Sequence, residues 1–317
     1  MSTILVPLDG SPLAEQALPH ACRLARASGS SLHLVRAALP VADPDAGTTS
    51  RSSVQHAETY LGNVRDRLRT EGYAVNISSL YSDPVPGILL AARVNGASLI
   101  VMSTHGRTGL RRMVLGSVTE RLVQDCHLPV LVVNNDSCSV APEGRYQHIL
   151  VPLDGSICAE AALTTIIAMQ LEHDAHLLLL RSVPPLGGAA GGYASGAYVQ
   201  PDLLDEDQQR LEAGQYLDLI AARYLHGQRF QTRVVAEYAA KAILDAIAES
   251  QVDLVVLATH ARHGIDRFAH TSVAGHVLHH TGTPVLVVHG TDTDAESPPL
   301  RAEPSREERF SDDCLFV

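Results

Sequence analysis

The chain has 317 residues, of which 45% are hydrophobic, and carries a formal net charge of −11. This length favours two domains, and this hydrophobic content excludes a disordered chain. The acidic balance argues against a general binder of nucleic acids or anionic membranes, and without tryptophan the chain shows no aromatic platform for single-stranded nucleic acid.

The first residues of the sequence and its cysteines favour a cytoplasmic location for the protein. Residues 1–8 enter an apolar strand directly, without the basic region and long apolar core of a signal peptide. No apolar run approaches the ~20 residues of a membrane span. The five cysteines are odd in number and form no Cys-x-x-Cys, so we expect a reduced, cytoplasmic protein without a membrane anchor. Residues 291–317 hold eight acidic residues against three arginines and are expected to form an acidic, disordered tail.

Short apolar strands alternate with amphipathic helices along the first half. The expected strands are residues 4–8, 32–37, 75–80, 99–102 and 130–133, and the expected helices are residues 11–27, 54–70, 85–94 and 117–125. Ser11 is expected to cap the first helix, with Pro12 at the first helical position. This alternation predicts a parallel α/β sheet with helices on both faces.

The chain contains an internal repeat. The sequence Ile-Leu-Val-Pro-Leu-Asp-Gly-Ser at residues 4–11 recurs at 149–156, and Pro-Val-Leu-Val-Val at 129–133 recurs at 284–288. Two matches in the same order indicate a duplicated domain. The offset grows from 145 to 155 residues, so the second copy contains a net insertion of ten, which we assign to the Gly/Ala-rich stretch 186–197.

The second half is expected to repeat the order of the first. Its further strands are expected at residues 177–180, 232–237, 254–257 and 285–288, and its helices at 159–171, 205–224, 239–250 and 272–280. We therefore predict two tandem, doubly wound, five-stranded parallel-sheet domains of Rossmann-like α/β architecture. Their expected bounds are 1–134 and 147–290, with a linker at 135–146.

The stretch that follows residues 99–102 has the parts of a phosphate cradle. A glycine-containing loop leads from this strand to a helix that starts near Gly116 and Ser117. Glycine lets the backbone approach a ligand closely, and the free N–H groups at a helix start attract an anion. Ser117 can cap the helix and can also donate its hydroxyl to a phosphate oxygen. The alternative is an ordinary strand-to-helix turn.

These motifs resemble a known family. The first half is similar to a universal stress protein domain, and the whole chain is similar to a tandem member of that family. The family's nucleotide-binding pattern, Gly-x2-Gly-x9-Gly-Ser/Thr, falls on Ser103, Gly106, Gly116 and Ser117, and Ser103 is its only departure. The resemblance implies a fold like that of adenine nucleotide alpha hydrolases. It also implies ATP as ligand, with or without Mg²⁺, and a role as a nucleotide-dependent sensor or regulator in stress response.

The resemblance also implies where the nucleotide lies. Adenosine would sit between the first and fourth strands, where the strand order of a doubly wound sheet reverses. Pro7 and Asp9 would flank the base, Ala37 would contribute backbone contacts, and the phosphates would extend to the glycine loop. The expected nucleotide-binding residues are Pro7, Leu8, Asp9, Ala37, Met102, Ser103, His105, Gly106, Arg107, Gly109, Gly116, Ser117, Val118 and Thr119.

Several of these residues have alternative roles. Asp9 can cap the following helix, and Thr119 can contact the terminal phosphate or belong to the helix surface. His105 is more typical of a loop-packing residue than of an acid or base. Arg107, with Arg111 and Arg112, can neutralise a triphosphate or form a solvated basic face.

The second half departs from the binding pattern. In the stretch that begins at Ala258, Ala261 stands at the second glycine of the pattern and Thr271 at the third, and each adds a β-carbon that would crowd a phosphate. Asp266 adds a negative charge within the loop. Although Asp154 and Ser272 persist, we predict that this second site is weak or empty, and that this half is structural or serves another ligand.

Histidines gather late in the chain, but their spacing does not indicate zinc. No cysteine or carboxylate accompanies them at a recognisable ligand spacing, which favours scattered surface histidines. We therefore expect no metal ligand and no catalytic residue. The histidines concerned are His260, His263, His270, His276, His279, His280 and His289.

Partners and competing functions are partly open. The last strands of the two halves, residues 130–133 and 285–288, are expected to pair within one chain as a pseudo-dimer, and a further homodimer and an unknown protein partner remain alternatives. A slow ATPase or phosphotransfer enzyme is disfavoured because the chain lacks a Walker Gly-Lys-Ser/Thr and a carboxylate pair for magnesium. An ATP pyrophosphatase is disfavoured because residues 8–11 lack its loop. Binding of another adenine nucleotide, such as a cyclic one, stays open.

Overall fold

The computed structural model describes residues 2–37, 49–104, 115–134, 145–171, 173–185, 206–260 and 272–290. Its strands are β1 (Thr3–Pro7), β2 (Ser31–Ala37), β3 (Val75–Leu80), β4 (Ala97–Ser103), β5 (Val130–Val133), β6 (His148–Pro152), β7 (His176–Val183), β8 (Arg229–Ala236), β9 (Leu254–His260) and β10 (Val285–Gly290). Its helices are η1 (Ala14–Gln16, a 3₁₀ turn), α1 (Ala17–Ser28), α2 (Thr49–Thr70), α3 (Pro84–Val94), α4 (Ser117–Asp125), α5 (Ile157–Ala168), α6 (Glu206–Tyr224), α7 (Ala239–Glu249) and α8 (Val273–His280).

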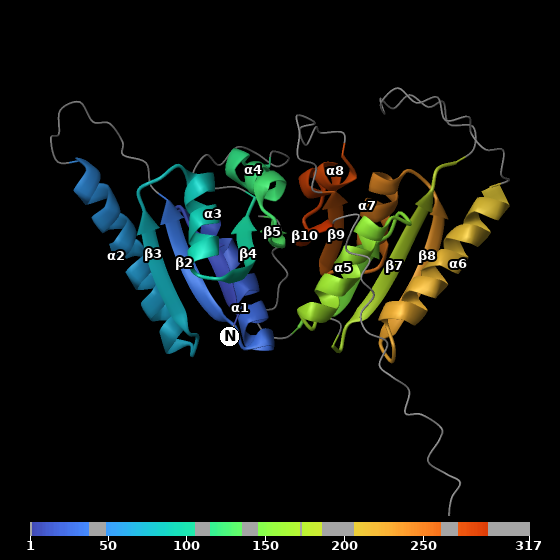
Figure 1. Cartoon of the computed structure of the whole chain (residues 1–317), viewed down its shortest axis with the longest axis horizontal. Helices are drawn as coiled ribbons and strands as arrows, with labels where there is room; N and C mark the ends of the chain where they lie inside the picture. The colour runs from blue at the N-terminus through green and yellow to red at the C-terminus, as the bar shows by residue number, and fades with distance from the viewer. Residues whose placement is uncertain are drawn as a thin grey trace, which may run out of the picture.

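The strands form one ten-stranded sheet in the order β3-β2-β1-β4-β5-β10-β9-β6-β7-β8 (Figure 1). Within each half, every neighbouring pair is parallel. Each half has the same order, with its first and fourth strands adjacent, so the chain direction across the sheet reverses between β1 and β4 and again between β6 and β9. The predicted α/β class and doubly wound order are confirmed.

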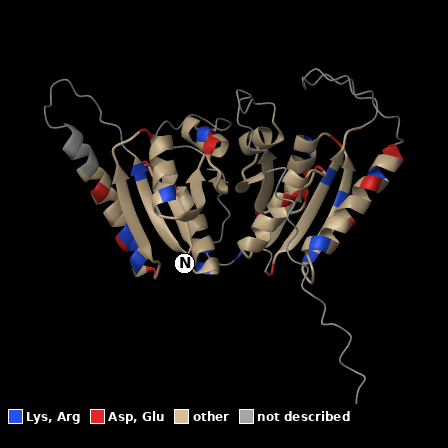
Figure 2. Ribbon diagram, in the orientation of Figure 1, with Lys and Arg blue, Asp and Glu red and all other residues tan. Residues whose placement is uncertain are grey.

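The two halves meet at β5 and β10, which lie side by side at the centre of Figure 1. They pair antiparallel, with Val130 opposite Val287 and Val132 opposite Val285. Neither strand carries a charged Lys, Arg, Asp or Glu side chain, as Figure 2 shows, and both are largely buried. The expected pairing of the last strands within one chain is therefore present, and it closes two apolar sheet edges that would otherwise favour aggregation.

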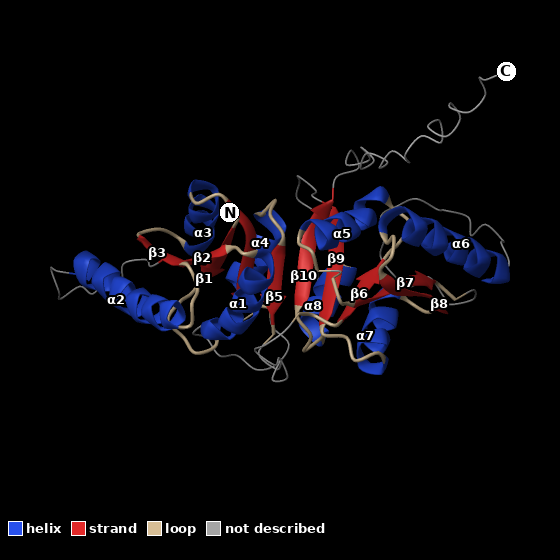
Figure 3. Cartoon of the chain, turned by 90° about the horizontal axis from the view of Figure 1, so that it is seen from below, coloured by secondary structure: helices blue, strands red, loops and turns tan. Residues whose placement is uncertain are grey.

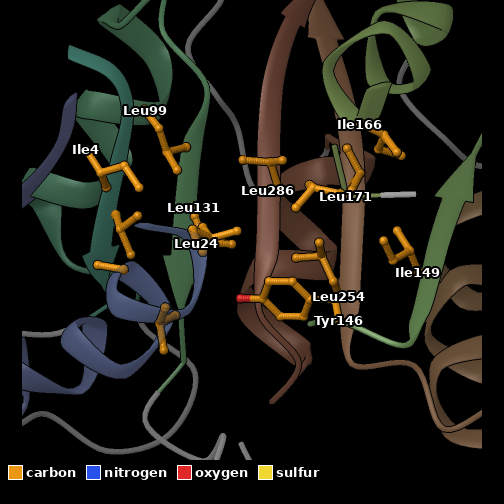
Figure 4. Packing of buried hydrophobic residues seen from close by; sticks show 14 of the residues in the cluster. Ile4, Leu24, Leu99, Leu131, Tyr146, Ile149, Ile166, Leu171, Leu254 and Leu286 are labelled. Carbon is orange, nitrogen blue, oxygen red and sulfur yellow. The ribbon is translucent and has the colours of Figure 1, made fainter. Parts of the chain in front are cut away.

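Helices cover both sides of the sheet (Figure 3). One apolar core packs α1, α2, α5 and α6 against the sheet, and the other packs α3, α4, α7 and α8 against it. Figure 4 shows that the first core is continuous across the junction, where Leu131 and Leu286 come from the two central strands. Tyr146, within the expected linker, is only 2% exposed and belongs to the same core. The two halves therefore share buried apolar surface as well as a sheet.

Three helix boundaries differ from the predicted ones by three residues or more. The first α-helix begins at Ala17 because the Ser11 hydroxyl accepts a hydrogen bond from the amide of Ala14 (3.1 Å) and begins a 3₁₀ turn instead. Helix α2 begins at residue 49, five residues earlier than predicted. Helix α5 ends at Ala168, since Gln170 adopts a positive φ of 54°. The expected insertion at 186–197 and the acidic tail lie outside the described residues.

Candidate functional site

A cavity of about 290 Å³ opens at the carboxyl ends of β1 and β4, where the strand order reverses. Ten of the fourteen residues expected to bind a nucleotide line it, and the other four (His105, Gly106, Arg107 and Gly109) lie outside the described residues. The lining consists of Pro7, Leu8, Asp9, Ala14, Val35, Ala37, Pro84, Ile88, Met102, Ser103, Thr104, Gly116, Ser117, Val118 and Thr119. The structure thus brings together residues from six separate segments, four of which the sequence analysis had grouped into one site.

The turn after β1 forms one wall of the cavity. Its first residue is anchored to the neighbouring strand, because the amide of Leu8 donates to the carbonyl of Val35 (2.8 Å). The Asp9 carboxylate accepts a hydrogen bond from the amide of Ser11 (2.8 Å), so it stabilises this turn rather than capping a helix. Gly10 has φ +89°, a conformation that L side chains rarely adopt, and this allows the chain to turn sharply beside the cavity.

The start of α4 forms the opposite wall. The residue that caps this helix is Gly116, with φ −62° and ψ 141°, and it has no side chain that could accept a hydrogen bond from the first turn. The prediction that Ser117 caps the helix was therefore wrong, since Ser117 is already its first helical residue. Among the described residues, none caps the first-turn amides of α4 with a side chain, which is the arrangement that favours an anion.

Glycine at position 116 is required by packing. A β-carbon on Gly116 would lie 2.7 Å from the carbonyl oxygen of Thr104, closer than such atoms approach in folded proteins. The amide of Gly116 donates to the same carbonyl (2.9 Å), which holds the start of α4 against the end of β4. The structure therefore needs glycine here so that α4 can pack against the end of β4, independently of any ligand.

Thr119 also links the start of α4 to the end of β4, through a buried side chain. Its hydroxyl donates to the carbonyl of Ser103 (3.1 Å), and the residue is only 2% exposed. A place on the helix surface, one of the two roles considered from the sequence, does not agree with this burial. Thr119 lines the cavity as a structural tie between α4 and β4.

Five lining residues were missed by the sequence reasoning: Ala14, Val35, Pro84, Ile88 and Thr104. Pro84 and Ile88 are the clearest omission, since they come from the first turns of α3, which packs in the same apolar core as α4. A doubly wound sheet places the helix after its third strand over the switch point, so this rule alone could have identified them.

A charged cluster lies next to the Asp9 turn. The Arg36 guanidinium lies against Gly10, where a β-carbon would come within 3.0 Å of its Nη1 atom, and it lies 5.4 Å from the ring centre of Tyr60. The Tyr60 hydroxyl donates to the Glu15 carboxylate (3.0 Å), and burial, followed by this carboxylate, raises the pKa of Tyr60. Tyr60 therefore stays neutral, and Arg36 supplies positive charge beside the cavity.

Comparison with known proteins identifies the family. The model of the Universal stress protein family matches the chain twice, over residues 1–134 and 145–289. The chain belongs to the universal stress protein family.

Individual relatives agree with this. Universal stress protein MJ0531 of Methanocaldococcus jannaschii is 33% identical over 136 residues, which covers 41% of this chain and 80% of the relative. Universal stress protein Mb2028c of Mycobacterium bovis is 27% identical over 216 residues, 68% of each chain. The crystal structure of a universal stress protein from Archaeoglobus fulgidus superposes with a TM-score of 0.69 at 18% identity, and the match covers 90% of this chain and 98% of that one. The universal stress protein fold therefore extends over both halves.

The second half of this universal stress protein has a smaller cavity in the equivalent place. Its volume is about 130 Å³, well below the roughly 300 Å³ at which ligand pockets of proteins begin. A larger side chain occupies it at one position, since Leu180 corresponds to Val35. The lining is Pro152, Leu153, Asp154, Ala159, Leu180, Ser182, Ala239, Ile243, Leu257, Ala258, Val273 and Ala274.

The helix at this second cavity is also capped differently. The Ser272 hydroxyl accepts a hydrogen bond from the amide of Gly275 (3.0 Å), so one first-turn donor of α8 is already satisfied. Ala274 replaces Thr119 and removes the hydroxyl that ties α4 to β4. The expected effects of Ala261, Asp266 and Thr271 fall outside the described residues.

The described ranges of the universal stress protein also bear on metal binding and on membrane spans. Within these ranges no group of three His, Cys, Asp or Glu side chains is placed to hold a metal ion. None of the helices there combines the length and hydropathy that a membrane span needs. Two of the late histidines, His276 and His280, stack on each other within α8 at 4.1 Å between ring centres.

Proposed function

We propose that the amino-terminal half of this universal stress protein binds ATP, with or without Mg²⁺, and that the chain acts in the cytoplasm as a nucleotide-dependent sensor or regulator in stress response. The binding unit is proposed to be residues 1–134. A linker at 135–146 joins it to a second domain at 147–290, whose cavity binds the same ligand weakly or not at all.

One observation supports this proposal most strongly. All ten of the expected nucleotide-binding residues that fall in the described ranges line one cavity, at the switch point where doubly wound folds bind their ligands. The volume of the cavity, about 290 Å³, is close to the roughly 300 Å³ at which the range for small-molecule sites begins. Its counterpart in the second half has less than half that volume, about 130 Å³.

The chemistry of the walls supports one orientation of the nucleotide. Val35, Ile88 and Met102 supply an apolar surface that suits the flat face of a base. The uncapped start of α4 supplies backbone N–H donors and the positive end of a helix dipole, which suit phosphate oxygens. The adenosine would therefore lie toward β1 and β2, and the phosphates toward Ser117.

The proposed phosphate contact can be tested at one backbone atom. Proline is tolerated at the first position of a helix, and the extended conformation of Gly116 suits a residue that precedes proline. The substitution Ser117→Pro therefore removes one N–H donor while the helix keeps its start. Isothermal titration with ATP and with adenosine should show that ATP affinity falls by about tenfold while adenosine affinity barely changes, since one hydrogen bond to a charged group contributes about 1.5–3 kcal/mol.

The matched control is Ser117→Ala, which removes the hydroxyl and keeps the amide. Because Ser117→Pro removes the hydroxyl as well as the amide donor, it should bind ATP about tenfold more weakly than Ser117→Ala does. The proposed orientation would be wrong if Ser117→Pro bound ATP as the unmodified protein does, or if it lost ATP and adenosine to the same extent.

A further inference from the structure

The carboxy-terminal half contacts α4, the helix that begins at the larger cavity. In the last turn of α8, the Nδ1 atom of His279 accepts a hydrogen bond from the amide of Leu115 (3.3 Å). Leu115 directly precedes Gly116 and Ser117, which line the cavity. A side chain 164 residues away in the sequence thus holds the backbone at the edge of the candidate nucleotide site.

The chemistry of this contact defines the state of His279. To accept at Nδ1, the imidazole must be neutral and carry its proton on Nε2. Leu115 is only 6% exposed, so its amide has little access to water as a substitute partner. Removal of the acceptor would leave a largely buried N–H unpaired, which costs more than the loss of an exposed hydrogen bond.

The far end of α4 is held from the same half. His289 in β10 hydrogen-bonds to the backbone of Val123, in the last turn of α4, and burial lowers the pKa of this imidazole. Two imidazoles from the carboxy-terminal half therefore contact the backbone just before α4 and in its last turn. Within its own half, α4 is tied at its start by the bonds of Gly116 and Thr119 to the end of β4.

A contact in the opposite direction, from the amino-terminal half to the end of α8, indicates that the two halves interact specifically. Asn134 occupies the position equivalent to His289, with the same offset of 155 as the last strands, and its amide donates to the carbonyl of Thr281 just after α8. Each half therefore holds the last helix of the other. Only α4, however, begins at the larger of the two cavities.

We propose that the carboxy-terminal half positions the nucleotide site of the amino-terminal half through α4, and that His279 is the positioning residue. This positioning role rests on the proposed function. It gives the second half a part in ATP binding by the first half, even if the second half binds no ligand itself. His279 does not touch the nucleotide. It fixes the backbone at Leu115, and thereby the direction of the first-turn amides of α4.

The test compares three substitutions in the full-length chain. His279→Ala removes the acceptor, and His279→Asn restores an acceptor oxygen near the place of Nδ1. His280→Ala is the matched control, because the Nδ1 of His280 bonds to the carbonyl of His276 within α8 itself. Hydrogen exchange of the amides of residues 115–119 is measured without nucleotide, and ATP affinity is measured by titration.

His279→Ala should speed exchange at these amides and weaken ATP binding by about tenfold, as expected for a buried donor left unpaired. His279→Asn should recover most of both effects, and His280→Ala should match the unmodified protein. Unchanged exchange in His279→Ala, or an equal effect of His280→Ala, would overturn the positioning role. If the unmodified protein binds no ATP, the proposed function fails, and the exchange measurement still decides whether His279 holds Leu115.

Discussion

The two halves of this universal stress protein share one strand order and differ in the side chains at the carboxyl ends of their strands. Both begin with the same eight-residue motif, and in both the residue after the first strand's proline is anchored by an identical 2.8 Å hydrogen bond, Leu8 to Val35 and Leu153 to Leu180. The cavities above these strands nevertheless differ from about 290 to about 130 Å³. A duplicated sheet can therefore keep its register while a few side chains at the strand ends decide whether a ligand fits.

The start of the last helix shows the same contrast in electrostatic terms. In the second half, Ser272 satisfies a first-turn amide of α8 with its own hydroxyl. In the first half, the equivalent Ser117 lies one position further into the helix, and Gly116 offers no side chain. The first half thus leaves donors for an external anion, whereas the second half uses its serine to complete its own helix.

The largest difference between the halves should appear when each cavity is filled by the same substitution. Val118 and Val273 occupy equivalent positions at the starts of α4 and α8, and each lines its own cavity. Val118→Phe should abolish measurable ATP binding, because the ring takes the space of the nucleotide. Val273→Phe should leave ATP affinity unchanged. Titration of both variants checks this, and an equal loss in both would contradict the assignment of the site to the first half.

A second difference concerns pH, because α1 carries His20 where α5 carries Thr165. His20 is 2% exposed and bonded at Nδ1 to the Tyr146 hydroxyl (2.8 Å). Burial, and then the charge of Arg23, lower the pKa of His20 from 6.5 to about 4. The unfolded chain therefore binds a proton on this residue between pH 6.5 and 4, and the folded chain does not. The associated stability is fully present above pH 6.5 and is lost as the pH falls toward 4.

The size of this pH effect on the free energy of unfolding follows from how far the pKa of His20 is lowered. The free energy of unfolding should fall by about 3 kcal/mol on this account between pH 7 and 4. His20→Asn removes the titration, so its denaturant midpoints should depend less steeply on pH than those of the unmodified protein. Parallel pH profiles for the two proteins would show that His20 is not buried in its neutral form.

The smallest expected difference concerns the two serines. Ser272→Ala should lower the free energy of unfolding by about 1 kcal/mol, because it removes a helix cap. Ser117→Ala should change it by less than about 0.5 kcal/mol without nucleotide, because its hydroxyl caps nothing. Denaturant unfolding of both variants provides the measurement, and a larger cost at Ser117 than at Ser272 would reverse the assignment of the caps.

Local pattern and the repeat were sufficient to predict the sheet and most of its helices. The alternation of apolar runs and the offset of 145 to 155 residues imply two parallel domains, and the apolar character of residues 130–133 and 285–288 implies their pairing. Boundaries failed where a side chain competes with the helix, as Ser11 does by bonding the Ala14 amide. Such competition depends on the exact path of the turn, which periodicity does not contain.

The site was predictable in its location and less so in the roles of its residues. The resemblance pointed to residues at the ends of β1, β2 and β4, and these line one cavity. It could not reveal that Thr119 is bonded to Ser103, because that requires the distance between α4 and β4. Nor could it reveal His279, whose contact with Leu115 exists only once the antiparallel register of β5 and β10 is set.

The most direct test of the account is the number of ATP molecules that the unmodified, full-length chain binds. Isothermal titration in the presence of Mg²⁺ should give one site per chain, because the first half offers a cavity of about 290 Å³ with an uncapped helix start and the second offers neither. Two equal sites per chain, or no site at all, would contradict it.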